Sequence, residues 1–265
     1  MSKPREERRS AVREFIECIN AGDAEDLMMH QTKDFTFIDY DGDVTTGRDD
    51  WYSYFENYPE YKIHIDHLLD GGNGVAIIGR TTGCHVGPKV EKNWTILWIA
   101  QVRGDLIAEW RIYSNVHEIR EKGNIGERTK EYMEKLDRVK STALKFVEAI
   151  NAGDVGGFMA LQTEDFMFMD NEGEVSKGRS GWNDYFTAYP NNKIHVNHII
   201  TSGNGIAILG RTTGSQVARE FEDRETILWT AEIRGDLVSE WRLYADIKDI
   251  ESGIQSGKKR ALKER

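Results

Sequence analysis

Two aspartates, Asp39 and Asp170, are the first candidates for chemistry. Each follows a short apolar segment and precedes a turn glycine. A carboxylate that faces an apolar cavity has its pKa raised by desolvation and becomes a useful general base or acid. A turn aspartate that accepts hydrogen bonds from its own backbone is the common alternative. The sequence leaves both interpretations open.

A second polar group lies on a predicted strand near position 110. Glu109, Arg111 and Tyr113 alternate and therefore share one face, whereas Trp110 lies on the other. An acid beside a guanidinium and a phenol is suited to polarising a carbonyl or an epoxide while an aspartate or water attacks. The alternative turns this polar face outward and places Trp110 toward the cavity. The same pattern recurs at Glu240, Arg242 and Tyr244.

Aromatic residues form the third candidate group, as the walls of a substrate cavity or as plain core. Histidines offer less, because His64 and His67 lie on opposite faces of one strand and cannot bind one metal ion together. No motif indicates a nucleotide, a haem or a metal, so we expect no cofactor. The aromatic candidates are Trp51, Trp98, Trp182 and Trp229, together with Tyr113 and Tyr244.

The chain contains one domain twice. With an offset of 131 residues and no gap, 52 of the 102 positions from Val12 to Tyr113 are identical to their partners. Asn20-Ala21-Gly22-Asp23, for example, returns as Asn151-Ala152-Gly153-Asp154. A period of this length is too long for a solenoid and indicates a duplicated domain. The domain that contains residues 12–113 is called copy 1 below, and the domain that contains residues 143–244 is called copy 2.

Each copy predicts an α+β fold. Apolar residues at helical spacing predict a first helix that ends at Gly22, and Asp23 is placed to cap a second short helix. A short strand and a helix near Gly47 follow. Period-two patterns then predict two hairpins, so that helices pack over one curved antiparallel sheet. The hairpin strands are predicted over residues 62–69, 75–82, 95–102 and 106–113.

The predicted organisation is two tandem domains. A chain of 265 residues is comfortable for two domains of about 130. Residues 127–145 are rich in helix formers and predict a helix between the copies. The predicted boundaries are 1–125 for the first domain, 126–139 for a helical linker, 140–252 for the second domain, and 253–265 for a basic tail.

Composition narrows the function classes. The net charge of −10 argues against nucleic acid as the main partner. No apolar stretch approaches the roughly 20 residues of a membrane span, and the N-terminal segment is charged where a signal peptide needs an apolar core. Two cysteines fit a reducing compartment. We therefore expect a cytoplasmic protein without a membrane partner.

Taken together, the helix ending in Asn-Ala-Gly-Asp, the strand leading to Asp-x-x-Gly and the long hairpins resemble the nuclear-transport-factor-2-like superfamily. The chain is most similar to its SnoaL-like polyketide cyclases and ketosteroid isomerases, over about Arg9–His117 and Lys140–Lys248. The resemblance implies two cone-shaped, cystatin-like α+β barrels that open between sheet and helices. It also implies that the copies form a pseudo-dimer within one chain, and further self-association stays open.

The resemblance implies a general base at Asp39 and Asp170, and it places the Glu/Arg/Tyr face of the last strand toward the cavity. The oxyanion donors of the isomerases, however, align with Phe15 and near Ile96, which cannot donate a hydrogen bond, so steroid isomerisation is not expected. Copy 1 alone has Cys84, His85 and Trp94, where copy 2 has Ser215, Gln216 and Glu225.

Two hypotheses follow. In the first, the protein binds a small apolar molecule bearing a carbonyl or epoxide and acts on it by cofactor-independent acid–base chemistry, as an isomerase, cyclase or hydrolase. In the second, it is a non-catalytic ligand-binding or assembly module. The discriminating feature is whether the aspartate lies in an open cavity beside the polar face of the last strand.

Overall fold

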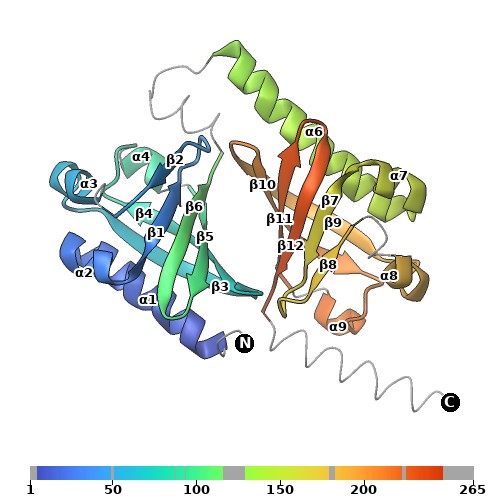
Figure 1. The fold of residues 1–265 in the computed structure, drawn as a ribbon, viewed down its shortest axis with the longest axis horizontal. Helices are drawn as coiled ribbons and strands as arrows, with labels where there is room; N and C mark the ends of the chain where they lie inside the picture. Colours follow the sequence, from blue (N-terminus) through green and yellow to red (C-terminus); the bar gives the residue numbers. More distant parts are fainter. Residues whose placement is uncertain are drawn as a thin grey trace. The chain divides into compact units, whose positions relative to one another are not determined.

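The computed structural model divides into two compact units, one built around each copy. Each copy has the predicted helices and long hairpins, in the predicted order (Figure 1). Trp182 and the predicted tail lie outside the described residues. The structure describes residues 5–48, 51–86, 88–92, 94–115, 129–178, 183–222 and 225–246.

In copy 1, two helices precede the sheet and two short helices flank its second strand pair. The sequence missed the short strand β2 and the one-turn helix α4. The elements are α1 (Arg5–Ala21), α2 (Ala24–Met29), β1 (Gln31–Ile38), β2 (Val44–Thr46), α3 (Trp51–Asn57), β3 (Lys62–Gly71), β4 (Gly74–Thr82), α4 (Pro88–Glu91), β5 (Ile96–Arg103) and β6 (Leu106–Tyr113).

Copy 2 repeats this order, and its first helix is longer, as the run of helix formers before it predicts. The elements are α6 (Lys130–Ala152), α7 (Val155–Ala160), β7 (Gln162–Met169), β8 (Val175–Lys177), α8 (Asn183–Ala188), β9 (Lys193–Ser202), β10 (Gly205–Thr213), α9 (Arg219–Glu222), β11 (Ile227–Arg234) and β12 (Leu237–Tyr244).

Each copy builds one six-stranded sheet, in the order β2-β1-β6-β5-β4-β3 for copy 1 and β8-β7-β12-β11-β10-β9 for copy 2. The sheet is mixed rather than wholly antiparallel as predicted. β1 lies parallel to β6, with Phe37 opposite Trp110. The long connection that a parallel pair requires is supplied here by the chain from β2 to β5. The first strand is thereby placed next to the last, and both end at the same edge of the sheet.

The first helix is fixed to the sheet by its apolar face and by one asparagine. Phe15 and Ile19 are buried against the sheet, as predicted. Asn20 at the helix end pairs with the backbone of Ile63 on β3, donating to its carbonyl at 2.9 Å and accepting from its N–H at 2.7 Å. Asn151 repeats this pairing with Ile194, which gives the repeated Asn-Ala-Gly-Asp motif a structural purpose.

The long hairpin of copy 1 is bent by an irregularity in β3. The register with β4 shifts between Ile65 and His67, so one residue bulges out of the ladder. Gly79 of β4 lies at this point, and a Cβ on it would overlap the carbonyl oxygen of His64. The glycine thus permits the close approach that curves the sheet around the helices.

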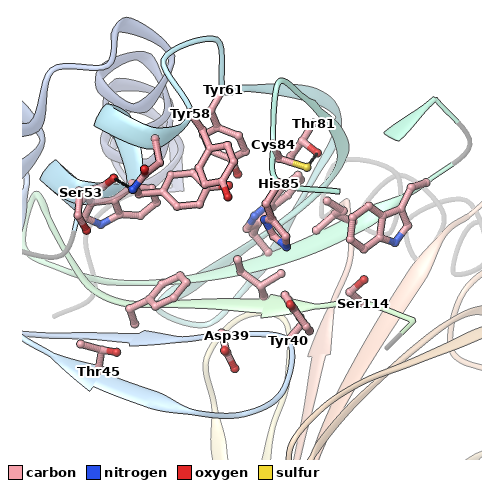
Figure 2. Close-up of a pocket in the computed structure, with 18 of the residues that line it drawn as sticks. Asp39, Tyr40, Thr45, Ser53, Tyr58, Tyr61, Thr81, Cys84, His85 and Ser114 are labelled. Atoms are coloured by element: carbon pink, nitrogen blue, oxygen red, sulfur yellow. Dashed lines mark hydrogen bonds between the residues drawn. The ribbon is translucent and has the colours of Figure 1, made fainter. Parts of the chain in front are cut away.

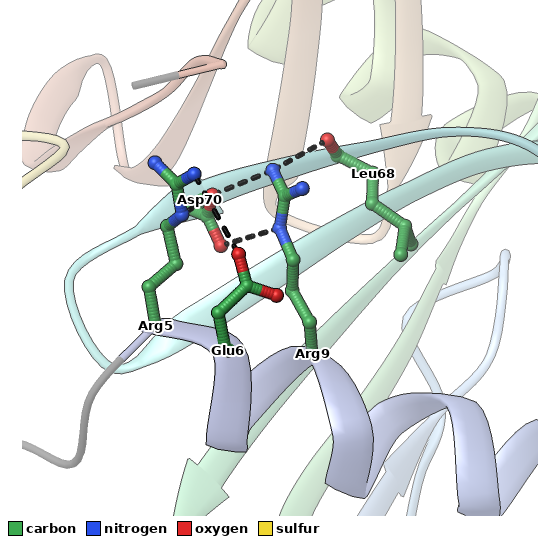
Figure 3. Close-up of polar contacts among 5 residues, drawn as sticks. All are labelled: Arg5, Glu6, Arg9, Leu68 and Asp70. Atoms are coloured by element: carbon green, nitrogen blue, oxygen red, sulfur yellow. Dashed lines mark hydrogen bonds and ion pairs between the residues drawn. The ribbon is translucent and has the colours of Figure 1, made fainter. Parts of the chain in front are cut away.

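A buried ion cluster fastens the start of α1 to β3 in copy 1 (Figure 3). Asp70 is fully buried, and Arg9 reaches its two carboxylate oxygens at 3.1 and 2.7 Å. Arg5 lies 3.4 Å from the same carboxylate, and Arg9 also donates to the carbonyl of Leu68. Burial raises the pKa of Asp70, and the Arg9 guanidinium partly offsets this. The cluster is particular to copy 1, because copy 2 has Leu136, Lys140 and Thr201 at these positions.

Among the residues that the structure describes, none of the helices combines the length and the apolar character that crossing a membrane requires.

Candidate functional site

Copy 1 contains a cavity of about 410 Å³ between the sheet and α3 (Figure 2). Its walls come from β1, β2, α3, β4, β5 and β6, and from the segments that follow α3 and β4. Figure 2 shows Tyr58 and Tyr61 on one side and Asp39 and Tyr40 on the other, with His85 between them. The volume is that of a site for a small organic molecule.

Aromatic rings dominate the lining. Tyr54 is perpendicular to Trp51 (83°) and to Tyr61 (87°), with ring centroids 6.1 and 5.1 Å away. Tyr58 lies 4.9 Å from Tyr54 by ring centroids. Phe35, Phe37, Trp94 and Trp98 complete the aromatic wall. Rings at right angles to one another form a corner whose faces and edges are both presented to a ligand.

Asp39 lies at the end of β1 and lines the cavity. Its Oδ1 atom accepts hydrogen bonds from the backbone N–H groups of Asp41 and Asp43, both at 2.9 Å. Burial raises the pKa of this half-buried carboxyl, and the hydrogen bond from Asp43 opposes the shift. The aspartate therefore organises the turn through its Oδ1 atom, and it is also a half-buried residue of raised pKa at the wall of an apolar cavity.

Asp170 occupies the equivalent turn of copy 2. Its Oδ1 atom accepts from the backbone N–H groups of Glu172, Gly173 and Glu174 at 2.8 to 2.9 Å. These three bonds account for the aspartate as a turn residue. The aspartate that lines the described cavity is the one in copy 1.

The loop after β4 is fixed by a buried glutamate. Glu91 of α4 is 4% exposed, and its carboxylate accepts from the backbone N–H groups of Gly83 at 3.1 Å and Cys84 at 2.7 Å. Gly83 has φ +74°, and a Cβ on it would overlap the carbonyl oxygen of Glu60. Copy 2 repeats this arrangement with Glu222. The glutamate thus positions the two side chains that follow, Cys84 and His85, at the cavity.

His85 lies between two tyrosine rings at the mouth of the cavity. It stacks on Tyr40 (centroids 6.2 Å apart, 17°) and meets Tyr58 edge-on at 6.0 Å. Desolvation lowers the pKa of His85, with the nearby Glu91 charge opposing the shift, so the neutral imidazole is favoured. A neutral imidazole both donates and accepts hydrogen bonds, so His85 can bind a polar ligand group or pass a proton.

Cys84 and Thr81 lie deeper, 3.6 Å apart from Oγ1 to Sγ. Burial raises the pKa of the Cys84 thiol to about 11, and the Glu91 carboxylate acts in the same direction. The thiol therefore keeps its proton near neutral pH and is a poor nucleophile. Burial also raises the pKa of Tyr54 and Tyr61, whose hydroxyl groups remain hydrogen-bond donors.

One cluster outside the cavity has metal-ligand side chains. Cys18, Asp26 and His30 bring one ligand atom each to within 4.8 Å of one another. The Cys18 thiol donates to Asp26 at 3.1 Å, and burial together with this carboxylate raises the pKa of the thiol to about 12. The Cys18 thiol therefore keeps its proton and serves as a hydrogen-bond donor to Asp26. None of the three residues of this cluster lines the cavity.

The sequence of the chain matches a known family of protein domains. Residues 12–110 and 143–246, which together make up more than half of the chain, match the SnoaL-like domain family. The chain belongs to the SnoaL-like family. It carries two SnoaL-like domains, one in each copy, and the expected tandem organisation is confirmed. Among curated protein sequences, none matches this chain.

Solved structures similar to this SnoaL-like chain are distant in sequence. An LEH-like epoxide hydrolase of M. tuberculosis is 12% identical, with a TM-score of 0.40, and covers 50% of this chain and 99% of its own. A SnoaL-like protein of unknown function from Burkholderia thailandensis is 16% identical (TM-score 0.36; 42% and 98%). An NTF2-like protein of unknown function from Cytophaga hutchinsonii is 17% identical (TM-score 0.35; 42% and 91%).

The expected orientation of the last strand is wrong. In the first SnoaL-like domain, Trp110 and Ile112 of β6 face the core and the cavity, so Glu109 and Arg111 lie on the opposite face. Arg111 is buried there, with its guanidinium 4.9 Å from the centre of the Tyr113 ring. The alternation of the strand fixes the assignment, because neighbouring residues point to opposite faces.

The same correction applies to the second SnoaL-like domain. Trp241 of β12 belongs to the core, and Glu240 and Arg242 pair with each other on the other face, with 3.1 Å between Nη2 and Oε2. Tyr244 is buried on that face too. The structure therefore brings neither Glu/Arg/Tyr group together with an aspartate at a cavity.

The tryptophans predicted to line a cavity or to fill the core have different positions in the two copies. Trp51 and Trp98 line the cavity of copy 1, and Trp229 is buried in the core of copy 2. His64 bonds to Thr82 at 3.0 Å and takes no part in the cavity. Sequence reasoning singled out Cys84, His85 and Trp94 as differences between the copies but missed Tyr40, Tyr58 and Tyr61. Comparison of the two copies could have found Tyr40 and Tyr61 as well, because copy 2 has Asn171 and Asn192 at these positions.

Proposed function

We propose that copy 1 binds a small, largely apolar molecule in its cavity and that Asp39 transfers a proton on that molecule without a cofactor. The observation that carries the proposal is the position of Asp39: a carboxyl of raised pKa that lines an aromatic cavity of about 410 Å³. A raised pKa makes the ionised carboxylate a stronger base.

The chemistry that this lining supports is removal of a proton next to a carbonyl. Asp39 takes the proton from the carbon, the electron pair moves to the carbonyl oxygen, and the proton returns to the same or another carbon. The developing oxyanion needs a donor, and the hydroxyl groups of Tyr54 and Tyr61 line the same cavity and keep their protons. His85 at the mouth is suited to exchanging the proton with solvent.

Deuterium exchange tests this proposal with simple model ketones in place of the natural substrate. The protein is incubated in D₂O with small cyclic ketones, and incorporation of deuterium at the α-carbon is followed by NMR. We expect catalysed exchange in the wild type and in Asp170→Asn, and its loss in Asp39→Asn. Asparagine keeps an oxygen that can accept the turn hydrogen bonds, so the loop is retained.

A non-catalytic binding module is the second candidate, favoured by the two turn hydrogen bonds that already engage Asp39. It predicts that ketones and apolar probes quench the cavity tryptophans saturably, while exchange is the same in the wild type and in Asp39→Asn. Absence of saturable binding by any apolar probe would contradict both candidates.

A further inference from the structure

The only charged residue among the described residues that line the copy 1 cavity, apart from its histidine, is an acid. Asp39 is a carboxylate at its wall, and Glu91 lies buried behind the loop of Cys84. The Glu91 carboxylate accepts the backbone N–H of the lining residue Cys84 at 2.7 Å, so its negative charge lies directly behind the cavity wall. Among the described residues that line the cavity, none is a lysine or an arginine. The field inside therefore disfavours anions.

Four basic residues directly adjoin lining residues in the sequence: Arg48, Lys62, Arg80 and Arg111. Arg80 is exposed, and Arg111 lies on the opposite face of β6 from the lining residue Ile112. Arg48 follows the lining residue Gly47, and its Nε donates to the carbonyl of Thr32 at 3.0 Å. Lys62 follows the lining residue Tyr61, but its ammonium group donates to the carbonyl of Asn20. None of these four cations is among the described residues that line the cavity.

The rings add a second source of negative potential. The face of an aromatic ring attracts a cation, tryptophan and tyrosine most strongly. Tyr54 is perpendicular to both Trp51 and Tyr61, which makes a corner of rings, and Tyr58 adjoins Tyr54. Because perpendicular rings present faces in different directions, such a corner can surround a bulky cationic group on more than one side.

Four of the ring-bearing side chains that line the cavity occur in copy 1 but not in copy 2. At the positions of Tyr40, Tyr61, His85 and Trp94, copy 2 has Asn171, Asn192, Gln216 and Glu225. Four ring-bearing lining residues of copy 1 thus correspond to non-aromatic residues in a domain that is otherwise about half identical. A cavity that only needed apolar volume would not require rings at all four positions.

We propose that the ligand of the copy 1 cavity is an organic cation, a tertiary or quaternary ammonium group on an otherwise apolar molecule. The charge lies against the tyrosine and tryptophan rings, and the carboxylates of Asp39 and Glu91 balance it. A weakly hydrated alkylammonium group is suited to this site, because the rings replace the few strong water contacts that it gives up. This inference rests on the proposed binding function of the cavity but not on proton transfer by Asp39.

A matched pair of probes tests the charge directly. (4-(Hydroxymethyl)phenyl)trimethylammonium and 4-tert-butylbenzyl alcohol have nearly the same shape, but only the first is charged. Binding of each to the full chain is measured by titration calorimetry and tryptophan quenching. We expect the cation to bind at least tenfold more tightly than its neutral counterpart.

Variants separate the two sources of attraction. Tyr58→Leu and Asp39→Asn are each expected to reduce the preference for the cation at least threefold, whereas Tyr58→Phe keeps the ring and retains the preference. Tyr189→Leu makes the same change in copy 2 and should leave it unaltered. Circular dichroism of each variant shows whether it is folded.

The outcomes distinguish this inference from the proposed function. If the neutral alcohol binds as tightly as the cation or more tightly, the cation proposal is overturned while the binding function stands. If neither probe binds but apolar ketones do, the cation proposal is likewise overturned and the binding function again stands. If the preference is present but unchanged in Tyr58→Leu and Asp39→Asn, the cation binds elsewhere and the assignment to this cavity is overturned.

Discussion

The carboxylate of Glu91 holds the backbone N–H of Cys84 at 2.7 Å, and Glu222 holds that of Ser215 at the same distance. Both copies therefore keep this pair of hydrogen bonds from a glutamate to the loop, here called the glutamate clamp, although the second residue that it holds is Cys84 in one copy and Ser215 in the other. The loop geometry is common to both copies, and the side chains it presents, Cys84 and His85 in copy 1, are what differ. Specialisation of the cavity rests on a shared scaffold.

Loss of the clamp should release the loop. In Glu91→Ala the partly buried N–H groups of Gly83 and Cys84 lose their carboxylate acceptor, and we expect copy 1 to be destabilised by about 2–3 kcal/mol. Hydrogen exchange at the amides of Gly83 and Cys84 should accelerate together. Glu222→Ala should cost copy 2 a similar amount without altering ligand binding to copy 1. Unchanged exchange at both copy 1 amides would show that the clamp does not hold the loop.

Neutralising Asp39 should stabilise the protein at pH 7. Its pKa is raised in the folded state, so the unfolded chain ionises first as the pH rises above about 4, and stability is lost until the folded carboxyl ionises too. Asp39→Asn removes this penalty, and we expect a gain of about 1 kcal/mol.

The gain should disappear below about pH 4, where the wild-type carboxyl is protonated in both states. Calorimetric unfolding midpoints at about pH 3.5 and pH 7 measure it, with Asp170→Asn as the control in the turn of copy 2. A lower midpoint for Asp39→Asn at pH 7 would assign this aspartate to the turn alone.

His85 should make copy 1 less stable in mild acid. Its pKa is lowered in the folded state, so the contribution of the neutral imidazole is complete above the unfolded value of about 6.5. As the pH falls through that value, the unfolded chain takes up the proton first and stability declines. His85→Gln, the residue of copy 2, should remove this component of the decline. Urea midpoints at about pH 7.5 and 5.5, with an NMR titration of the His85 ring, check the sign.

The Asp70 cluster should be costly to break. Asp70→Ala leaves Arg5 and Arg9 without their shared carboxylate in a largely buried site, and we expect a loss of about 3–5 kcal/mol in copy 1. Lys140→Ala, at the copy 2 position equivalent to Arg9, should change stability by less than about 0.5 kcal/mol. Denaturant unfolding measures both. Equal effects would mean that the ion cluster contributes nothing beyond a helix contact.

The fold was predictable where local pattern and packing agree. Phe15 and Ile19 are buried as the helical spacing predicts, and Asp23 caps α2 through the N–H of Asp26 at 3.0 Å. The parallel pairing of β1 with β6 was not predictable, since it depends on contacts between distant segments. A period-two pattern describes a strand equally well in either direction.

The site was predictable in part for the same reason. Asp39 follows β1 and Trp51 begins α3, elements whose ends are set by local residues, and both side chains are found in the lining of the cavity. The face of β6 was not decided by its sequence, because Trp110 and the Glu109–Arg111 pair each make a plausible inner face. Burial of the larger indole decided it in the folded chain. Tyr58 and Tyr61 reach the cavity through the path of the chain after α3, which no local pattern describes.

The closing strand pair also bears on how the chain folds. Phe37 finds Trp110 across 73 residues, and Phe168 finds Trp241 across the same interval, with the same residue types in the same register. During refolding from denaturant, β1 therefore meets two nearly equivalent partners, and a strand exchanged between copies would form a kinetic trap. Synthesis from the N-terminus avoids this choice, because β6 leaves the ribosome before β7 and β12 exist. The yield of folded protein should accordingly be higher for chains that fold during synthesis than for chains refolded from denaturant.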